Sequence, residues 1–301
     1  KSPGGTISSA RKYSRKLLVF DKPIRELHWR AESKLGGDLN MLRSLLSLKS
    51  YRLEAKDGEL GTLTNFYFDD ERWTVRYMGV NISSWLPGAD VLVPIVSVKG
   101  DPGIKSRTIP VELTREQVKN APTIDDVKPV SRQMEKTLLT RYRYPAYWHG
   151  FGVTPSSFDT SSAEAEVERY IELKEKEIDS THLRSLNEVR GYHVAARDNT
   201  FGHVEDFIVD DEAPWKVRYL VIDTKNYWPF SKQVIVAPDW TQGIRWGDRE
   251  VALNLTEQQV KDSPTYSPDE PINREREVRL YDYYGRPKYW EDEAYPHPPM
   301  F

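Results

Sequence analysis

The stretch Leu42-Arg-Ser-Leu45 decides the fold, because it occurs again 141 residues later as Leu183-Arg-Ser-Leu186. The match continues without a gap over the 29 residues that begin at Leu42, and 11 of these 29 positions are identical. After one inserted residue, Trp73-Thr-Val-Arg-Tyr77 aligns with Trp215-Lys-Val-Arg-Tyr219. A period of this length indicates two copies of a whole domain, because the repeats of a solenoid are much shorter.

Each copy begins with signals for short strands. Asp57-Gly58 predicts a tight turn between two extended stretches, and Asp198-Asn199 stands at the matching place in the second copy. Alternating side chains over 219–223 and the apolar run 234–236 predict strands, and 246–251 predicts a further hairpin. Short strands at this spacing are typical of a small barrel or sandwich.

Helical patterns follow the strands in both copies. Thr256 and Gln259 have the spacing of a capping box, as do the matching residues of the first copy. A second helix is expected to begin after Ser131 and after Asn273, which are both good N-cap residues. The sequence therefore predicts a mainly β protein with short helices, built as two small β-barrels in tandem, each with a C-terminal helical extension.

Length and composition agree with two domains and exclude several classes of protein. The chain has 301 residues, which is about two domains at roughly 100–200 residues each. It contains no Cys, so disulfides, thiolate metal sites and cysteine nucleophiles are excluded. No apolar run approaches the roughly 18 residues of a membrane-spanning helix. We expect a basic N-terminal arm (1–40), repeat 1 (41–150), a linker with an acidic helix (151–182) and repeat 2 (183–301).

Several of these motifs together resemble the PRC-barrel domain. The resemblance is carried by Phe201-Gly-His-Val-Glu-Asp-Phe-Ile-Val-Asp-Asp211 and 215–224 in the second copy, and by Gly58-Glu-Leu-Gly61, 65–70 and Trp85-Leu-Pro-Gly88 in the first. This family is named after the cytoplasmic barrel of the photosynthetic reaction centre H subunit, and a related barrel occurs in a ribosome-maturation factor. The two-copy layout is similar to bacterial tandem PRC-barrel proteins of unassigned role. The resemblance implies two β-barrels and no catalytic residues.

Two groups of residues are candidate metal ligands. The acidic runs 69–71 and 210–212 could bind Ca²⁺ or Mg²⁺, but hairpin turns that pair with Arg76 and Arg218 explain them better. His193 and His203 flank the first hairpin of the second copy and could hold Zn²⁺ or Cu²⁺. The first copy has Arg52 and Thr62 at these positions, so the fold requires no metal there. We expect neither a metal nor a cofactor.

Motifs of catalysis are absent from the sequence. It contains no Gly-x-Ser-x-Gly elbow, no His-Glu-x-x-His and no phosphate-binding glycine loop. We therefore expect a non-enzymatic protein-interaction or assembly module that is a subunit or adaptor of a larger complex. Two alternatives stay open: an RNA-linked assembly factor, and a protein that binds or converts a small ligand between the barrels.

Exposed aromatic residues are the expected partner contacts, because Tyr and Trp dominate interface hot spots. The candidates are two loop tips and the two aromatic closes of the repeats, namely Trp85, Leu86, Tyr227, Trp228, Trp148 and Trp290. The basic arm carries Arg11, Lys12, Arg15 and Lys16, which could meet phosphates, although we expect protein partners rather than nucleic acid. The two barrels are expected to pack around a pseudo-two-fold axis. A cytoplasmic protein is expected, with membrane contact only through a partner or at the periphery.

Overall fold

The computed structural model describes residues 42–86, 90–119, 121, 130, 132–144, 183–211, 215–224 and 232–294. We call residues 42–144 the first half and residues 183–294 the second half. The basic arm, the linker 151–182 and its acidic helix lie outside the described residues. Both halves belong to one compact unit of the chain.

The two halves repeat the same order of elements. The first half contains β1 (Leu42–Ser44), α1 (Leu45–Leu48), β2 (Arg52–Ala55), β3 (Gly58–Asp69), β4 (Thr74–Asn81), β5 (Asp90–Pro94), η2 (Ile95–Ser97), β6 (Thr108–Pro110), α2 (Arg115–Lys119) and α3 (Arg132–Tyr142). The second half contains β7 (Leu183–Ser185), α5 (Leu186–Val189), β8 (His193–Ala195), β9 (Thr200–Asp210), β10 (Lys216–Asp223), β11 (Gln233–Val236), η3 (Pro238–Trp240), β12 (Thr241–Arg245), β13 (Glu250–Leu253), α6 (Glu257–Lys261), α7 (Arg274–Tyr284) and α8 (Tyr289–Ala294).

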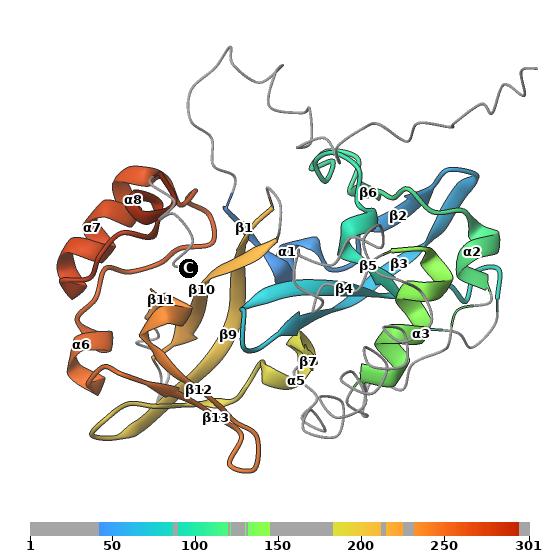
Figure 1. The fold of residues 1–301 in the computed structure, drawn as a ribbon. Coiled ribbons are helices and arrows are strands. Elements are labelled where there is room, and N and C mark those ends of the chain that lie inside the picture. Colours follow the sequence, from blue (N-terminus) through green and yellow to red (C-terminus); the bar gives the residue numbers. More distant parts are fainter. Residues whose placement is uncertain are drawn as a thin grey trace, which may run out of the picture. The chain divides into compact units, whose positions relative to one another are not determined.

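The described strands join into one curled sheet that runs through both halves (Figure 1). Its order is β12-β13-β8-β9-β10-β4-β3-β2-β6, so the halves meet where β10 lies beside β4. The expectation of a mainly β protein with short helices is confirmed. Closure into two separate barrels stays a prediction, because the structure shows a curled half-barrel sheet of 13 strands.

The core is shared between the halves. Phe68 of β3 contacts Phe207 of β9, with ring centroids 5.1 Å apart, and Phe66 lies 6.2 Å from Trp215. The buried hydrophobic side chains of both halves form one continuous cluster. Truncation of a buried Phe costs about 3–5 kcal/mol, so a mutation of this core in one half is expected to destabilise the other.

Two matching glycines allow the strands to approach closely. A Cβ at Gly61 would lie 2.3 Å from the carbonyl oxygen of Asn81, and a Cβ at Gly202 would lie 2.2 Å from that of Asp223. Neither distance is compatible with a side chain, so both positions require glycine. Gly79 of β4 is the register partner of Asn65, beside a register shift between Leu63 and Asn65.

The helix signals are confirmed where they are described. Thr256 and Gln259 form a complete capping box at the start of α6, and Asn273 caps α7 through its side chain. Helix α7 ends at Gly285, which adopts the left-handed conformation with φ 61°. Figure 1 shows α6, α7 and α8 grouped at the outer side of the second half.

Candidate functional site

The repeated Leu-Arg-Ser-Leu stretch forms a short segment that each half donates to the other. The first exchange segment, β1–α1 (Leu42–Leu48), pairs antiparallel with β9 of the second half. The second exchange segment, β7–α5 (Leu183–Val189), pairs in the same way with β3 of the first half. Figure 1 shows β7 and α5 in yellow beneath the blue and cyan strands of the first half. The repeat therefore builds a reciprocal contact between its two copies.

A polar residue on the receiving strand holds each exchange segment. In the first half, Asn65 donates from Nδ2 to Ser185 Oγ at 2.8 Å and accepts from the backbone N–H of Asn187 at 3.2 Å. In the second half, Asp206 takes the matching place. It accepts from the Ser44 hydroxyl and, at 3.1 Å, from the backbone N–H of Leu46. Both side chains are buried, so these hydrogen bonds satisfy groups that would otherwise be costly.

An arginine of each exchange segment binds an aspartate of the other half. Arg43 pairs with Asp211, and their side chains are only 9% and 2% exposed. Arg184 pairs with Asp70 at 3.2 Å. The Arg184 guanidinium also lies 3.6 Å from the centroid of the Trp246 ring, in the turn between β12 and β13. These are shielded charge pairs, in which loss of one partner is strongly destabilising.

The backbones of the two halves meet at matching positions of the repeat. Thr74 of β4 is in register with Lys216 of β10, and these are matching positions of the repeat. The N–H of Val75 donates to the carbonyl of Trp215 at 3.0 Å, and the N–H of Val217 donates to that of Trp73 at 2.7 Å. Both tryptophans have a positive φ, 50° for Trp73 and 59° for Trp215. This conformation is rare for bulky residues, and the shared sheet and aromatic core maintain it here.

Burial perturbs the two carboxylates that hold the first exchange segment. Burial raises the pKa of Asp206 to about 6, although hydrogen bonds from Ser44, Phe207 and Leu46 oppose the shift. Burial also raises the pKa of Asp211 to about 6, against the attraction of Arg43. Both carboxylates are thus ionised at neutral pH in surroundings that disfavour the charge.

The described aspartates of the acidic runs bind backbone N–H groups and arginines and do not form an open ligand set. Asp69 Oδ1 accepts the backbone N–H groups of Glu71 and Arg72, and its Oδ2 lies 3.4 Å from Arg76. Arg218 binds Asp210 at 3.1 Å in the second half. These are the pairings expected from the sequence, and the exchange-segment arginines bind the next aspartate in each run.

A second buried cluster joins helix α7 to the sheet. Glu277 accepts from the hydroxyls of Tyr219 at 2.7 Å and Tyr289 at 2.9 Å, and its other oxygen lies 2.8 Å from Arg274. Burial raises the pKa of Glu277. Glu135 is buried at the matching place in the first half. A carboxylate that is engaged on all sides fixes a helix and is not poised for chemistry.

The aromatic interface candidates that are described pack largely against their own half. Trp85 donates from Nε1 to the carbonyl of Leu60 at 2.6 Å, and Leu86 is half-buried against the core. Trp290 is also half-buried, 5.1 Å from the ring of Tyr281. Tyr227, Trp228 and Trp148 lie outside the described residues, as do Arg11, Lys12, Arg15 and Lys16. Their roles as contacts stay predictions.

The two histidines face each other across adjacent strands. His193 is the register partner of His203, and His203 lies 3.4 Å from Glu205. His193 Nδ1 is 3.3 Å from the carbonyl oxygen of Gly202. Within the described ranges no three His, Cys, Asp or Glu side chains are grouped closely enough to hold a metal ion.

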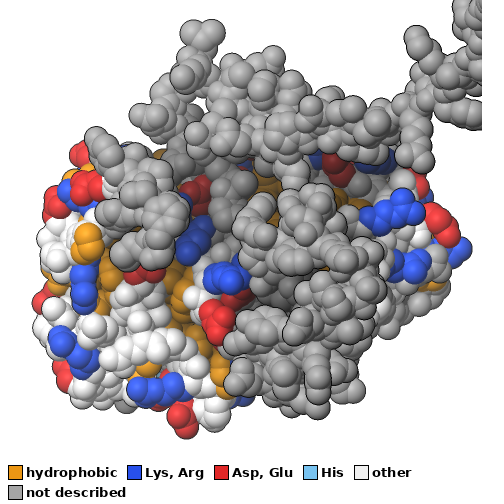
Figure 2. Space-filling view, in the orientation of Figure 1, with side chains coloured by type: hydrophobic (Ala, Val, Ile, Leu, Met, Phe, Trp, Pro, Cys, Tyr) orange, Lys and Arg blue, Asp and Glu red, His pale blue; other side chains and the backbone are white. Residues whose placement is uncertain are grey.

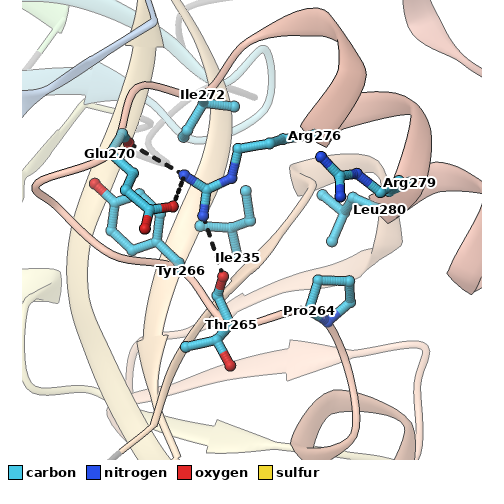
Figure 3. A pocket seen from close by; sticks show the side chains of 9 residues that line it. All are labelled: Ile235, Pro264, Thr265, Tyr266, Glu270, Ile272, Arg276, Arg279 and Leu280. Carbon is cyan, nitrogen blue, oxygen red and sulfur yellow. Dashed lines mark hydrogen bonds and ion pairs between the residues drawn. The ribbon is translucent and has the colours of Figure 1, made fainter.

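A pocket of about 270 Å³ lies beside α7 (Figure 3). All of its lining residues belong to the second half, so it is not the pocket between the copies that a ligand-binding function would need. The Arg276 guanidinium in this pocket binds Glu270 at 2.9 Å and the carbonyl of Thr265 at 3.3 Å. N–H groups of the Arg276 guanidinium are thus already bound to oxygen atoms of the chain itself.

The structure adds exposed residues that sequence reasoning missed. Val96 is 61% exposed and Ile104 is 59% exposed, both in the first half, and Tyr283 is 42% exposed in the second. The sequence signal that could have found two of them is a difference in residue type between matching positions of the two copies. The register of β5 and β11 aligns Val96 with Asp239, and the positive φ of Arg107 and Arg249 aligns Ile104 with Trp246.

The described surface and the comparisons leave the class of protein open. On the face shown in Figure 2, Lys and Arg side chains are interspersed with Asp and Glu. No protein-family model matches the chain, and no curated protein is significantly similar to it in sequence. Among the described helices, none combines the length and the apolar character needed to cross a membrane.

Proposed function

We propose that the chain is a tandem PRC-type barrel protein that acts as a non-enzymatic protein-interaction or assembly module within a larger complex. The observation that supports this proposal most is the use of the residues shared by both copies. Leu-Arg-Ser-Leu, the paired aspartates and the tryptophans directly before β4 and β10 contact the opposite half. These residues, which are identical in both copies, thus hold the two halves together. The surface that differs between the copies is free to recognise a partner.

Partner recognition is assigned to the exposed apolar positions where the first half departs from the second. Val96 replaces the charged Asp239, and Ile104 lacks the stacking that Trp246 makes with Arg184. Apolar side chains that are exposed in one copy only are not required by the fold. A protein partner would bury them, because apolar contacts in the centre of an interface supply most of the binding energy.

The test is affinity purification of the full chain from its native host, with one half of each sample treated with RNase. The partner is then purified and its affinity for the chain is measured. Val96→Asp with Ile104→Asp is compared with Tyr283→Asp, a matched exposed substitution in the other half. We expect an RNase-resistant partner whose affinity falls at least tenfold with the first variant only, at an unchanged melting temperature.

Two outcomes would overturn this proposal. Recovery of ribosomal proteins that disappear on RNase treatment would indicate an RNA-linked assembly factor. Recovery of the bait alone, or a partner whose affinity is equal for both variants, would remove the assigned surface and the adaptor role that depends on it.

A further inference from the structure

The two halves offer equivalent receiving sites for one tetrapeptide sequence. The site on β9 is formed by Asp206 and Asp211, and the site on β3 by Asn65 and Asp70. Each receives a segment that begins Leu-Arg-Ser-Leu and continues as a short helix capped by the serine. A second copy of this chain carries the same segments. We infer that the first exchange segment, Leu42–Leu48, also docks on β9 of another copy, so that chains associate by exchanging this segment.

Exchange between chains reproduces every contact that the segment makes within one chain. The strand pairing, the Ser44–Asp206 hydrogen bond and the Arg43–Asp211 pair are the same whichever copy supplies β9. Domain swapping needs no new interface for this reason, and only the connecting hinge changes. The partner is therefore a chain that carries this segment, and a second copy of this protein carries it.

The first exchange segment is held less favourably than the second. Its site contains Asp206, a buried carboxylate, where the matching site contains the neutral Asn65. Burial raises the pKa of Asp206 and of Asp211, so at neutral pH the docked segment covers two charges that water would solvate better. Release of this segment is accordingly easier than release of the other.

The hinge of the first exchange segment is also strained. Ser50, just after α1, has a φ of 70°, and the matching hinge residue in the second half is Gly191 with a φ of 91°. Glycine adopts this region without steric cost, whereas serine does not. The docked first segment therefore carries a backbone cost at its hinge that the second segment avoids. Both asymmetries select Leu42–Leu48 as the segment that exchanges.

This inference deepens the proposed assembly role but needs no foreign partner, so the two can fail separately. The absence of Cys from the chain permits a direct test. Leu42 and Asp210 are register partners, and opposed strand residues are close enough for a disulfide. One chain carries Leu42→Cys and a differently tagged chain carries Asp210→Cys. They are mixed at high concentration, incubated and oxidised. A chain with both substitutions checks that the pair links within one molecule.

The control pair is Thr74→Cys with Lys216→Cys on separate chains, which reports exchange of whole halves across β4 and β10. We expect a disulfide-linked dimer from the 42/210 mixture and none from the 74/216 mixture. Arg43→Ala, which removes the ion pair of the first segment, should speed formation of this dimer at least tenfold. Arg184→Ala, the matched change in the second segment, should not.

Each other result overturns the inference. No dimer from the 42/210 mixture, with efficient linking inside the double variant, means that the segment stays in its own chain. Dimers from both mixtures mean that whole halves exchange. Equal acceleration by Arg43→Ala and Arg184→Ala means that general destabilisation, and not release of the first segment, drives association.

Discussion

Replacement of Asp206 by asparagine copies into the second half the residue that the first half already has. Asn65 donates to Ser185 and accepts two backbone N–H groups, from Phe66 and Asn187. An asparagine side chain in place of Asp206 can make the same contacts with Ser44, Phe207 and Leu46. The substitution keeps the shape of the side chain and the number of its hydrogen bonds, and it removes one buried charge.

The size of the effect follows from the pKa of Asp206. Burial raises this pKa from 3.8 to about 6, which is about two pKa units, or about 3 kcal/mol at 1.36 kcal/mol per unit. The folded state binds the proton of Asp206 more tightly than the unfolded state does. The stabilisation that protonation gives to the folded state is therefore complete below pH 3.8 and is lost as the pH rises through about 6. Asp206→Asn should therefore raise the free energy of unfolding by up to about 3 kcal/mol at pH 7.5 and by little at pH 4.

The assay is urea unfolding followed by tryptophan fluorescence at pH values from 4 to 8. Asn65→Asp is the matched reverse substitution, and it should destabilise the protein at pH 7.5 and recover on acidification. Destabilisation by Asp206→Asn at pH 7.5 would refute the reasoning. It would mean that the charge-assisted hydrogen bonds to the carboxylate outweigh its burial. An equal effect at pH 4 and pH 7.5 would show that the charge is not responsible.

Three further predictions concern the fold. Gly202→Ala should lower the free energy of unfolding by roughly 2 kcal/mol or more, because its Cβ would collide with the carbonyl of Asp223 at a positive φ; an unchanged melting temperature would contradict this. Glu277→Ala leaves the buried hydroxyls of Tyr219 and Tyr289 without their acceptor and should cost about 3 kcal/mol, measured by denaturant unfolding. Calorimetry should show one cooperative transition, because the halves share a sheet and a core, and two separated transitions would disprove that coupling.

Local signals predicted the elements well, because each depends on a few neighbouring residues. The turn at Asp57-Gly58 separates β2 from β3, and the capping box of Thr256 and Gln259 starts α6. Helix α3 begins at Arg132, directly after the expected cap position, and ends at Tyr142. Helix α7 begins directly after Asn273, as expected, and ends at Tyr284, before Gly285 in the left-handed conformation.

The exchange of segments could not be predicted from the sequence. Leu42–Leu45 and Leu183–Leu186 are identical, so their pattern fits pairing within a half as well as pairing between halves. The choice is made by tertiary geometry at the receiving strands, where Asn65 and Asp206 hold the serines of the exchange segments from matching positions. A polar residue directly before the apolar runs 66–68 and 207–209 is the available signal, and the partner of Asn65 lies more than a hundred residues away.

In a duplicated chain whose halves exchange matching segments, residues at the contact between the halves are more constrained in sequence than exposed residues. The Arg43–Asp211 and Arg184–Asp70 pairs must both persist, because loss of either leaves a shielded charge without its partner. No such constraint acts on Val96, which is exposed and whose counterpart is Asp239. Substitutions at exposed positions are usually nearly neutral for stability, so divergence there is free to serve recognition. Regions that differ between the halves are consequently where a partner that distinguishes them must bind.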